Sequence, residues 1–228
     1  MLYLVIIYAS IFLIFTGVHL YASLIKRDSL RGPTKTVILL SILGMYLEWC
    51  HYNLSDPSIF IVLALITSWL GDVLLIPKGV KWFTFGGIFF MISHIFFILG
   101  YYESGINFAN INVIFIIIIA LVYLVTAIIL FSKLKPSLPK ALFYPLFFYL
   151  LINATMNAFA WFRLLSGSCS VLSGVITAIG ALLFFISDSS LFFVRFDKNS
   201  KLKTHFIVML TYSIGEFLIV LGLMFLMI

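Results

Sequence analysis

Two aspartates lie in strongly apolar parts of the chain, where a carboxylate is costly. Asp72 occurs in Ser-Trp-Leu-Gly-Asp-Val-Leu-Leu and Asp188 in Phe-Phe-Ile-Ser-Asp-Ser-Ser-Leu. An acidic side chain at bilayer depth costs about 2.5–3.5 kcal/mol on insertion scales, so such residues mark a pathway or a catalytic site. Two carboxyl groups support general acid and base chemistry, in which one donates a proton while the other activates water or stabilises a cation.

The composition places both aspartates in an all-α integral membrane protein. The 228 residues are 64% hydrophobic and 10% charged, with a mean hydropathy of +1.22, values that exclude a soluble domain. Apolar segments of spanning length, about 17–25 residues, predict a single bundle of eight transmembrane helices that forms one domain over residues 1–228. The predicted spans, of which the second is short, are Leu2–Ile25, Thr36–Cys50, Ser58–Ile76, Trp82–Tyr101, Asn110–Ser132, Ala141–Phe162, Val171–Val194 and His205–Ile228.

The basic residues predict the orientation of this bundle. Of the 14 Lys and Arg, all but Arg163 lie in alternate loops, namely the first, third, fifth and seventh. By the positive-inside rule these loops are cytoplasmic and both termini lie outside. In a bacterium the membrane would be the inner one. The same distribution directs the net charge of +6 towards anionic lipid headgroups, so nucleic acid is not an expected partner.

Further polar side chains are expected close to the aspartates, because polar groups in a membrane interior need partners. Tyr149, Asn153 and Asn157 recur at intervals of four residues and therefore share one helix face. Each has a structural interpretation as well, as interhelical hydrogen bonding or as packing. An ion pair with Lys or Arg would be the structural explanation for the aspartates themselves. We disfavour it, because no basic residue lies within the predicted spans of Asp72 and Asp188.

The histidines were considered as metal ligands. The chain contains no His-x-x-x-His, and its four histidines are widely separated. A three-histidine zinc site is therefore disfavoured, although His19 and His205, both near the cytoplasmic edge, leave it open. We predict no metal and no cofactor.

Three motifs in this order carry a resemblance to a known family: Gly-Asp-Val-Leu-Leu at 71–75, Phe-Gly-Gly at 85–87 followed by Ser93-His94, and Gly-Ala-Leu-Leu-Phe-Phe-Ile-Ser-Asp at 180–188. The chain resembles the YhhN-like lysoplasmalogenase family of integral membrane vinyl ether hydrolases over nearly its whole length. It departs from the family pattern at Glu216, where a Gln usually follows Tyr212 by four residues, and after Lys35, where a Pro is common.

The resemblance implies hydrolysis of the vinyl ether bond of lysoplasmalogens, which yields a fatty aldehyde and glycerophosphocholine or glycerophosphoethanolamine. Such a bond is cleaved by protonation at carbon and capture of the resulting cation by water, so a pair of aspartates fits. We assign Asp188, which has serines beside it, as the base, and Asp72, which has apolar neighbours, as the acid. The candidates to bind or position the lysophospholipid are Lys35, His94, Tyr149, Asn153, Asn157, Ser187, Tyr212 and Glu216, and those to hold its phosphate are Lys78, Lys81 and Arg195.

The alternative function is a proton-coupled membrane transporter, because buried carboxylates also relay protons. Against it, both aspartates lie towards the cytoplasmic side, and no Pro interrupts a predicted span near its middle. The similar strings around Asp72 and Asp188, four helices apart, indicate a parallel repeat of a four-helix unit. The site would open towards the cytoplasm, with membrane lipids as its surroundings; the sequence does not predict an oligomeric state.

Overall fold

The computed structural model describes residues 2–197 and 205–225, and these residues form helices without any strand. The first half of the chain forms α1 (Leu2–Leu24), α2 (Asp28–Tyr52), α3 (Ile59–Leu74) and α4 (Val80–Glu103). The second half forms α5 (Val113–Leu134), α6 (Phe143–Leu165), α7 (Val171–Phe196) and α8 (His205–Met224). Short 3-10 turns, η1 (Phe108–Asn110), η2 (Lys135–Ser137) and η3 (Lys140–Leu142), lie on either side of α5.

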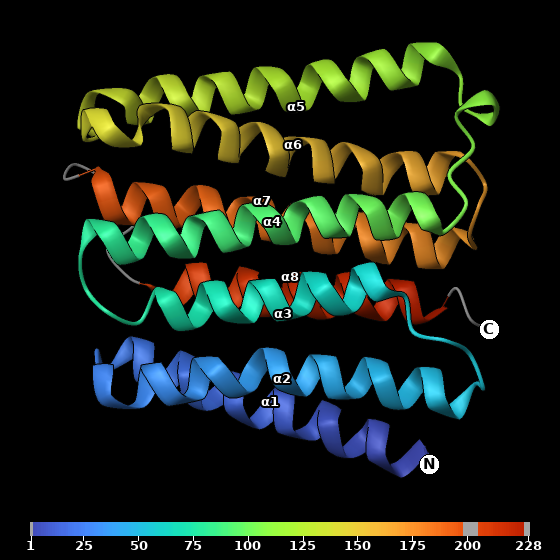
Figure 1. Ribbon diagram of the computed structural model, residues 1–228, viewed down its shortest axis with the longest axis horizontal. Coiled ribbons are helices and arrows are strands. Elements are labelled where there is room, and N and C mark those ends of the chain that lie inside the picture. Colours follow the sequence, from blue (N-terminus) through green and yellow to red (C-terminus); the bar gives the residue numbers. More distant parts are fainter. Residues whose placement is uncertain (1, 198–204, 226–228) are drawn as a thin grey trace.

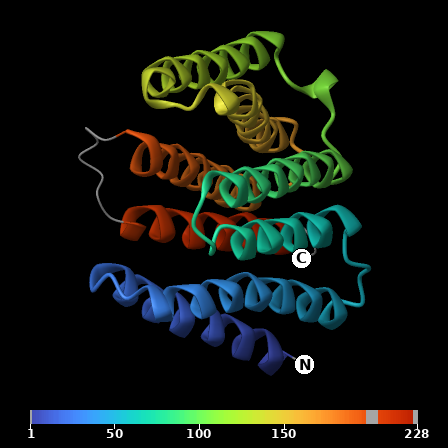
Figure 2. The ribbon, with the colours of Figure 1, turned by 60° about the vertical axis from the view of Figure 1, so that its left-hand side comes forward.

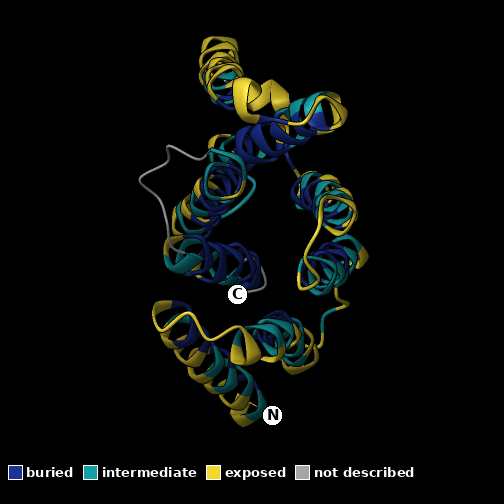
Figure 3. Cartoon of the chain, turned by 90° about the vertical axis from the view of Figure 1, so that its left-hand side faces the viewer, coloured by how far each residue is buried: buried dark blue, intermediate teal, exposed yellow. Residues whose placement is uncertain are grey.

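The helices run back and forth along one common axis (Figure 1). Consecutive helices pack as antiparallel pairs, α1 on α2, α3 on α4, α5 on α6 and α7 on α8, and a second view preserves this pairing (Figure 2). The α1–α2, α3–α4 and α5–α6 connections lie at one end of the bundle, which we call the basic end, and the α2–α3, α4–α5 and α6–α7 connections lie at the other. Buried faces point towards neighbouring helices and exposed faces outwards (Figure 3).

Six of the helical segments in the described residues are long and apolar enough to cross a membrane, so this is a multi-pass membrane protein. They are α1, α4, α7 and α8, together with α5 extended through η2 and α6 extended through η3. The helix α3 is apolar but has 16 residues, and α2 begins with charged residues. A topology of eight spans with both termini outside therefore stays a prediction. Three basic residues of the seventh loop, Lys198, Lys201 and Lys203, and residues 226–228 of the last predicted span lie outside the described residues.

The prediction for α2 was wrong. The helix begins at Asp28 rather than at Thr36, so Arg31 and Lys35 lie on the helix and not in a loop. Asp28 favours this start because its carboxylate stabilises the positive N-terminal end of the helix dipole, and it also pairs with Arg31 at 3.0 Å, three residues along the helix. The helix continues through Pro33 and carries Lys35 into the bundle.

The helix of the third predicted span ends earlier than expected. The helix α3 ends at Leu74 rather than at Ile76, so Asp72 lies in its last turn, and residues 75–79 connect it to α4. Asp188, by contrast, lies well inside α7, which ends only at Phe196.

Glycines set the close approach of the helices that carry the aspartates. A Cβ built on Gly180 of α7 would lie 2.7 Å from the carbonyl oxygen of Gly215 in α8, and one on Gly71 of α3 would lie 3.2 Å from that of Gly86 in α4. Small residues allow this approach in membrane helix pairs. Gly180, the first residue of the motif that ends in Asp188, is therefore a packing residue.

The helix pairs in contact agree with a repeat of four helices. Adding four to each helix number turns the α1–α2, α2–α3 and α3–α4 contacts into the α5–α6, α6–α7 and α7–α8 contacts, all of which are present. The contact of α4 with α6 corresponds in the same way to that of α8 with α2, which is also present.

The buried Arg163 closes the end of the bundle opposite the basic end. Its guanidinium donates to the hydroxyl oxygens of Ser104 at 3.1 Å, Thr177 at 3.0 Å and Ser173 at 2.8 Å. These bonds connect α6 to α7 and to the residue that follows α4, so the basic residue that stands apart in the charge pattern serves the packing of the bundle.

We predict that Gly180→Ala destabilises the protein. The added Cβ would meet backbone atoms of α8 at 2.6–2.7 Å, and overpacking of this kind costs about 1–3 kcal/mol. Thermal unfolding in detergent should show a lower Tm than wild type. Gly17→Ala is the control, because an exposed Cβ there meets nothing within 4 Å. Equal Tm values for the two variants would contradict the packing role of Gly180.

Candidate active site

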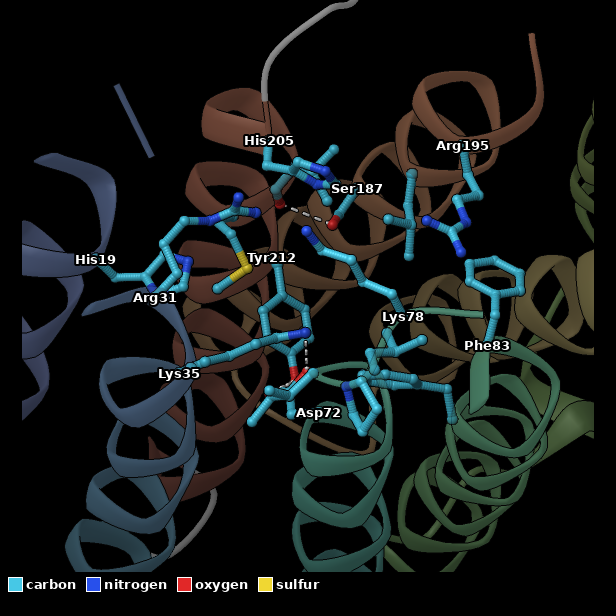
Figure 4. A pocket seen from close by; sticks show the side chains of 18 of the residues that line it. His19, Arg31, Lys35, Asp72, Lys78, Phe83, Ser187, Arg195, His205 and Tyr212 are labelled. Carbon is cyan, nitrogen blue, oxygen red and sulfur yellow. Dashed lines mark hydrogen bonds and ion pairs between the residues drawn. The ribbon is translucent and has the colours of Figure 1, made fainter. Parts of the chain in front are cut away.

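A cavity of about 480 Å³ lies at the basic end of the bundle, and both aspartates line it. Figure 4 shows Asp72 among the side chains around this cavity. Helices α1, α2, α3, α4, α7 and α8 all contribute to its wall, so residues far apart in the sequence meet around it. Its ionisable and aromatic lining residues are His19, Asp28, Arg31, Lys35, Asp72, Lys78, Phe83, Phe90, Asp188, Arg195, His205 and Tyr212.

Asp72 is a fully buried carboxylate with a cation beside it. The ammonium of Lys35 lies 2.8 Å from Oδ1, and the hydroxyl of Tyr212 donates to Oδ2 at 2.8 Å (Figure 4). The inference that no basic residue reaches Asp72 was therefore wrong, because α2 begins early enough to bring Lys35 to it. Asp72 has apolar neighbours in the sequence, but its partners in space are polar.

Asp188 is held by neutral donors from α6. The hydroxyl of Tyr149 donates at 2.5 Å and the amide of Asn153 at 2.8 Å, both to Oδ2. Asn157 donates in turn to the side-chain oxygen of Asn153 at 3.1 Å and so orients it. Two residues of the polar face predicted on this helix, Tyr149 and Asn153, therefore support Asp188. Asn157 is one hydrogen bond removed from the carboxyl group.

The imidazole ring of His94 lies beside the carboxyl group of Asp188. Its Nε2 lies 3.4 Å from the Oδ2 of Asp188, while its Nδ1 lies 2.5 Å from the carbonyl oxygen of Phe90. A carbonyl oxygen only accepts, so Nδ1 carries a hydrogen. The Nε2 of His94 therefore faces the carboxyl group of Asp188.

The serine beside Asp188 does not hold it. Ser187 lines the cavity, but its hydroxyl donates to the carbonyl oxygen of Val208 at 2.8 Å (Figure 4). This bond connects α7 to α8. The premise that flanking serines stabilise the charged form of Asp188 was wrong for Ser187.

Glu216 lies outside the cavity lining. It is fully buried on α8, where its Oε1 accepts from the hydroxyl of Ser68 at 2.8 Å, and Ser68 lies 2.7 Å from the hydroxyl of Ser93. This chain connects α8, α3 and α4. The structure therefore gives Glu216 a contact with α3 in the core, whereas we had expected it to position substrate.

The mouth of the cavity carries charges of both signs. Lys78 and Arg195 line it as predicted, whereas Lys81 does not. Asp28 lies 3.4 Å from Lys78 and 3.0 Å from Arg31, and the hydrogen bond to Lys78 and the charge of Arg31 hold the pKa of Asp28 below its usual value. Sequence reasoning missed Asp28 and Arg31 as site residues, because only the folded α2 brings them to the mouth.

The two histidines near the basic end also line the cavity. The Nδ1 of His19 lies 2.9 Å from the hydroxyl of Thr34, and His205 lies at the start of α8. Within the described residues, no group of three or more His, Cys, Asp or Glu side chains is arranged to hold a metal ion.

Fold and site together define a class: a multi-pass helical membrane protein with two buried carboxyl groups at the base of a charged cavity. Within that class, the chain belongs to the YhhN family, whose model matches residues 30–223. The match includes both aspartates and every residue named above that contacts them. No curated protein and no solved structure matches the chain.

We predict that Lys35→Met destabilises the protein and that a second change, Asp72→Asn, restores much of the loss. Breaking a buried ion pair costs about 3–5 kcal/mol because one charge is left uncompensated, and the partial exposure of Lys35 makes this an upper bound. Thermal unfolding of both single variants and the double variant measures the coupling. A double variant no more stable than Lys35→Met alone would contradict the ion pair.

Proposed function

We propose that the protein is a lysoplasmalogenase-type hydrolase that cleaves the vinyl ether bond of a lysophospholipid with water. The observation that carries this proposal is that two aspartates line one cavity whose mouth carries cations. Asp72 is supported by a cation and Asp188 by neutral donors. Membership of the YhhN family agrees with it.

The reaction needs a proton delivered to carbon. The acid protonates the vinyl carbon that is not bonded to oxygen, and the electron pair of the double bond forms the new C–H bond. The resulting oxocarbenium cation takes up water, whose proton goes to the carboxylate that the acid has become. The hemiacetal then breaks its bond to the glycerol oxygen, which takes a proton from that acid while the hemiacetal hydroxyl returns its own proton to the carboxylate. The products are a fatty aldehyde and a glycerophospho-alcohol, and the acid is regenerated.

The contacts favour Asp188 as the acid and Asp72 as the stabilising anion, the reverse of the assignment made from sequence. The hydrogen-bond donors described around Asp188 and the Nε2 of His94 all meet Oδ2, so Oδ1 is the oxygen that would carry the proton. Asp72 has both oxygens engaged, one by the cation of Lys35, so it supplies the negative charge that stabilises the oxocarbenium cation.

The charges at the mouth suit a zwitterionic headgroup. The cations of Lys78, Arg195 and Arg31 can bind its phosphate, and the carboxylate of Asp28 can pair with its amine or quaternary ammonium group. The vinyl ether then lies deeper in the cavity, next to the aspartates. By the positive-inside rule the basic end faces the cytoplasm, so substrate would enter from the inner leaflet.

We predict that Asp188→Asn and Asp72→Asn each reduce aldehyde release at least about 100-fold, within the range of general acid–base effects. Purified protein in detergent, a lysoplasmalogen and a carbonyl-reactive reporter provide the assay. Asp56→Asn, an exposed carboxylate between α2 and α3, is the control, and activity should not change with a chelator. If folded wild type releases no aldehyde but moves protons in liposomes, the transporter replaces the hydrolase.

We predict that Lys78→Ala and Arg195→Ala raise KM for the lysophospholipid about tenfold with little change in kcat, because they remove binding shared by the ground and transition states. Lys81→Ala is the matched control, since Lys81 lies in the first turn of α4, close to Lys78 in the sequence, but does not line the cavity. Initial rates over a range of substrate concentrations separate the two parameters. An equal KM increase in Lys81→Ala would indicate general attraction to the membrane surface instead of a phosphate site.

A further inference from the structure

A second hollow of about 470 Å³ lies between α4, α6 and the last turns of α7. Its lining is formed by apolar and aromatic side chains with Gly87 and Thr84, and none of the lining residues is charged. Ile88 and Phe148 on its walls are 38% and 54% exposed, on a surface that would face lipid. We call this hollow the lateral groove.

A single aromatic layer separates the lateral groove from the charged cavity. Phe83 lines both hollows. Tyr149 lines the lateral groove, and its hydroxyl reaches through to Asp188. The ring of Phe192 lies 5.1 Å from that of Tyr149 and 6.0 Å from that of Phe83, edge to face in both cases. The lateral groove therefore begins one side chain away from the proposed acid.

The two hollows together match the two parts of a lysophospholipid. The charged cavity offers cations and an anion to a headgroup, and the lateral groove offers an uncharged, lipid-facing channel of similar volume to a hydrocarbon chain. The bond to be cleaved joins these two parts, and Asp188 lies at their junction.

We infer that the lateral groove is the subsite for the single hydrocarbon chain of the substrate, and that the aldehyde product leaves through it sideways into the bilayer. The inference rests on the proposed function. Lipid tails are as apolar as the groove, so binding the chain adds little affinity. Its role is to align the vinyl ether with Asp188, and filling the groove acts by steric exclusion.

Gly87 allows a direct test. A Cβ built there meets nothing within 4 Å, and Gly87 lines the lateral groove, so the side chain of Gly87→Phe starts in open space and occupies the groove. We expect kcat/KM for a long-chain lysoplasmalogen to fall about tenfold or more, while a short-chain analogue is hydrolysed within about twofold of wild type. Gly17→Phe, at an exposed glycine of α1 whose Cβ is equally unobstructed, is the matched control.

Two outcomes are distinct. If wild type hydrolyses lysoplasmalogen and Gly87→Phe keeps the wild-type preference for chain length, the assignment of the lateral groove as the chain subsite is overturned, while the proposed hydrolase activity is supported. If wild type hydrolyses no lysoplasmalogen, the proposed activity is wrong, and the chain subsite is tested by lipid binding alone.

The binding test uses a lysophospholipid with a photoreactive diazirine at the end of its chain. Irradiation in detergent followed by peptide mass spectrometry should place the adduct on residues that line the groove, such as Ile88, Met91 or Ile152, and Gly87→Phe should abolish it. Adducts spread over lipid-facing helices such as α5, or unchanged in Gly87→Phe, would overturn the inference.

Discussion

The cost of burying a carboxylate in an apolar bundle is the constraint on which this structure depends. A buried acidic side chain must receive hydrogen bonds or a cation, or it destabilises the fold by several kcal/mol. Neither aspartate obtains these from its own helix. Asp72 on α3 takes them from α2 and α8, and Asp188 on α7 takes them from α6 and α4. Meeting this requirement brings distant parts of the chain around one cavity.

The predicted four-helix repeat would place these two arrangements at corresponding positions, and they differ in the groups that support each aspartate. Adding four to the helix numbers turns α2 and α8 into α6 and α4, so each aspartate is supported from corresponding helices. In the first half α2 contributes a full cation, Lys35, whereas in the second half α6 contributes the neutral donors Tyr149 and Asn153. A similar framework thus creates two unlike carboxyl groups, which is what one acid and one stabilising anion require.

The sequence predicted the class, the family and the central residues, because apolar length, charge pattern and an isolated acid in an apolar segment are local signals. It predicted the polar face of α6 for the same reason. It did not predict the partner of Asp72, since Pro33 and the charges around it are typical of a loop, and only tertiary packing extends α2 to Asp28. It also placed Glu216 at the substrate, because Glu216 shares a helix face with Tyr212, which lines the cavity. Glu216 lies one turn further along α8, where it contacts Ser68 instead.

The central claim is that the protein delivers a proton to a vinyl carbon, and isotope labelling of the products tests it most directly. Wild-type protein would hydrolyse a lysoplasmalogen in deuterated water enriched in oxygen-18, with the aldehyde trapped as it forms. The account predicts one deuterium on the carbon next to the aldehyde group and no oxygen-18 in the glycerophospho-alcohol, because the bond to the glycerol oxygen breaks on the hemiacetal side. An aldehyde without that deuterium, or oxygen-18 in the glycerol, would contradict it.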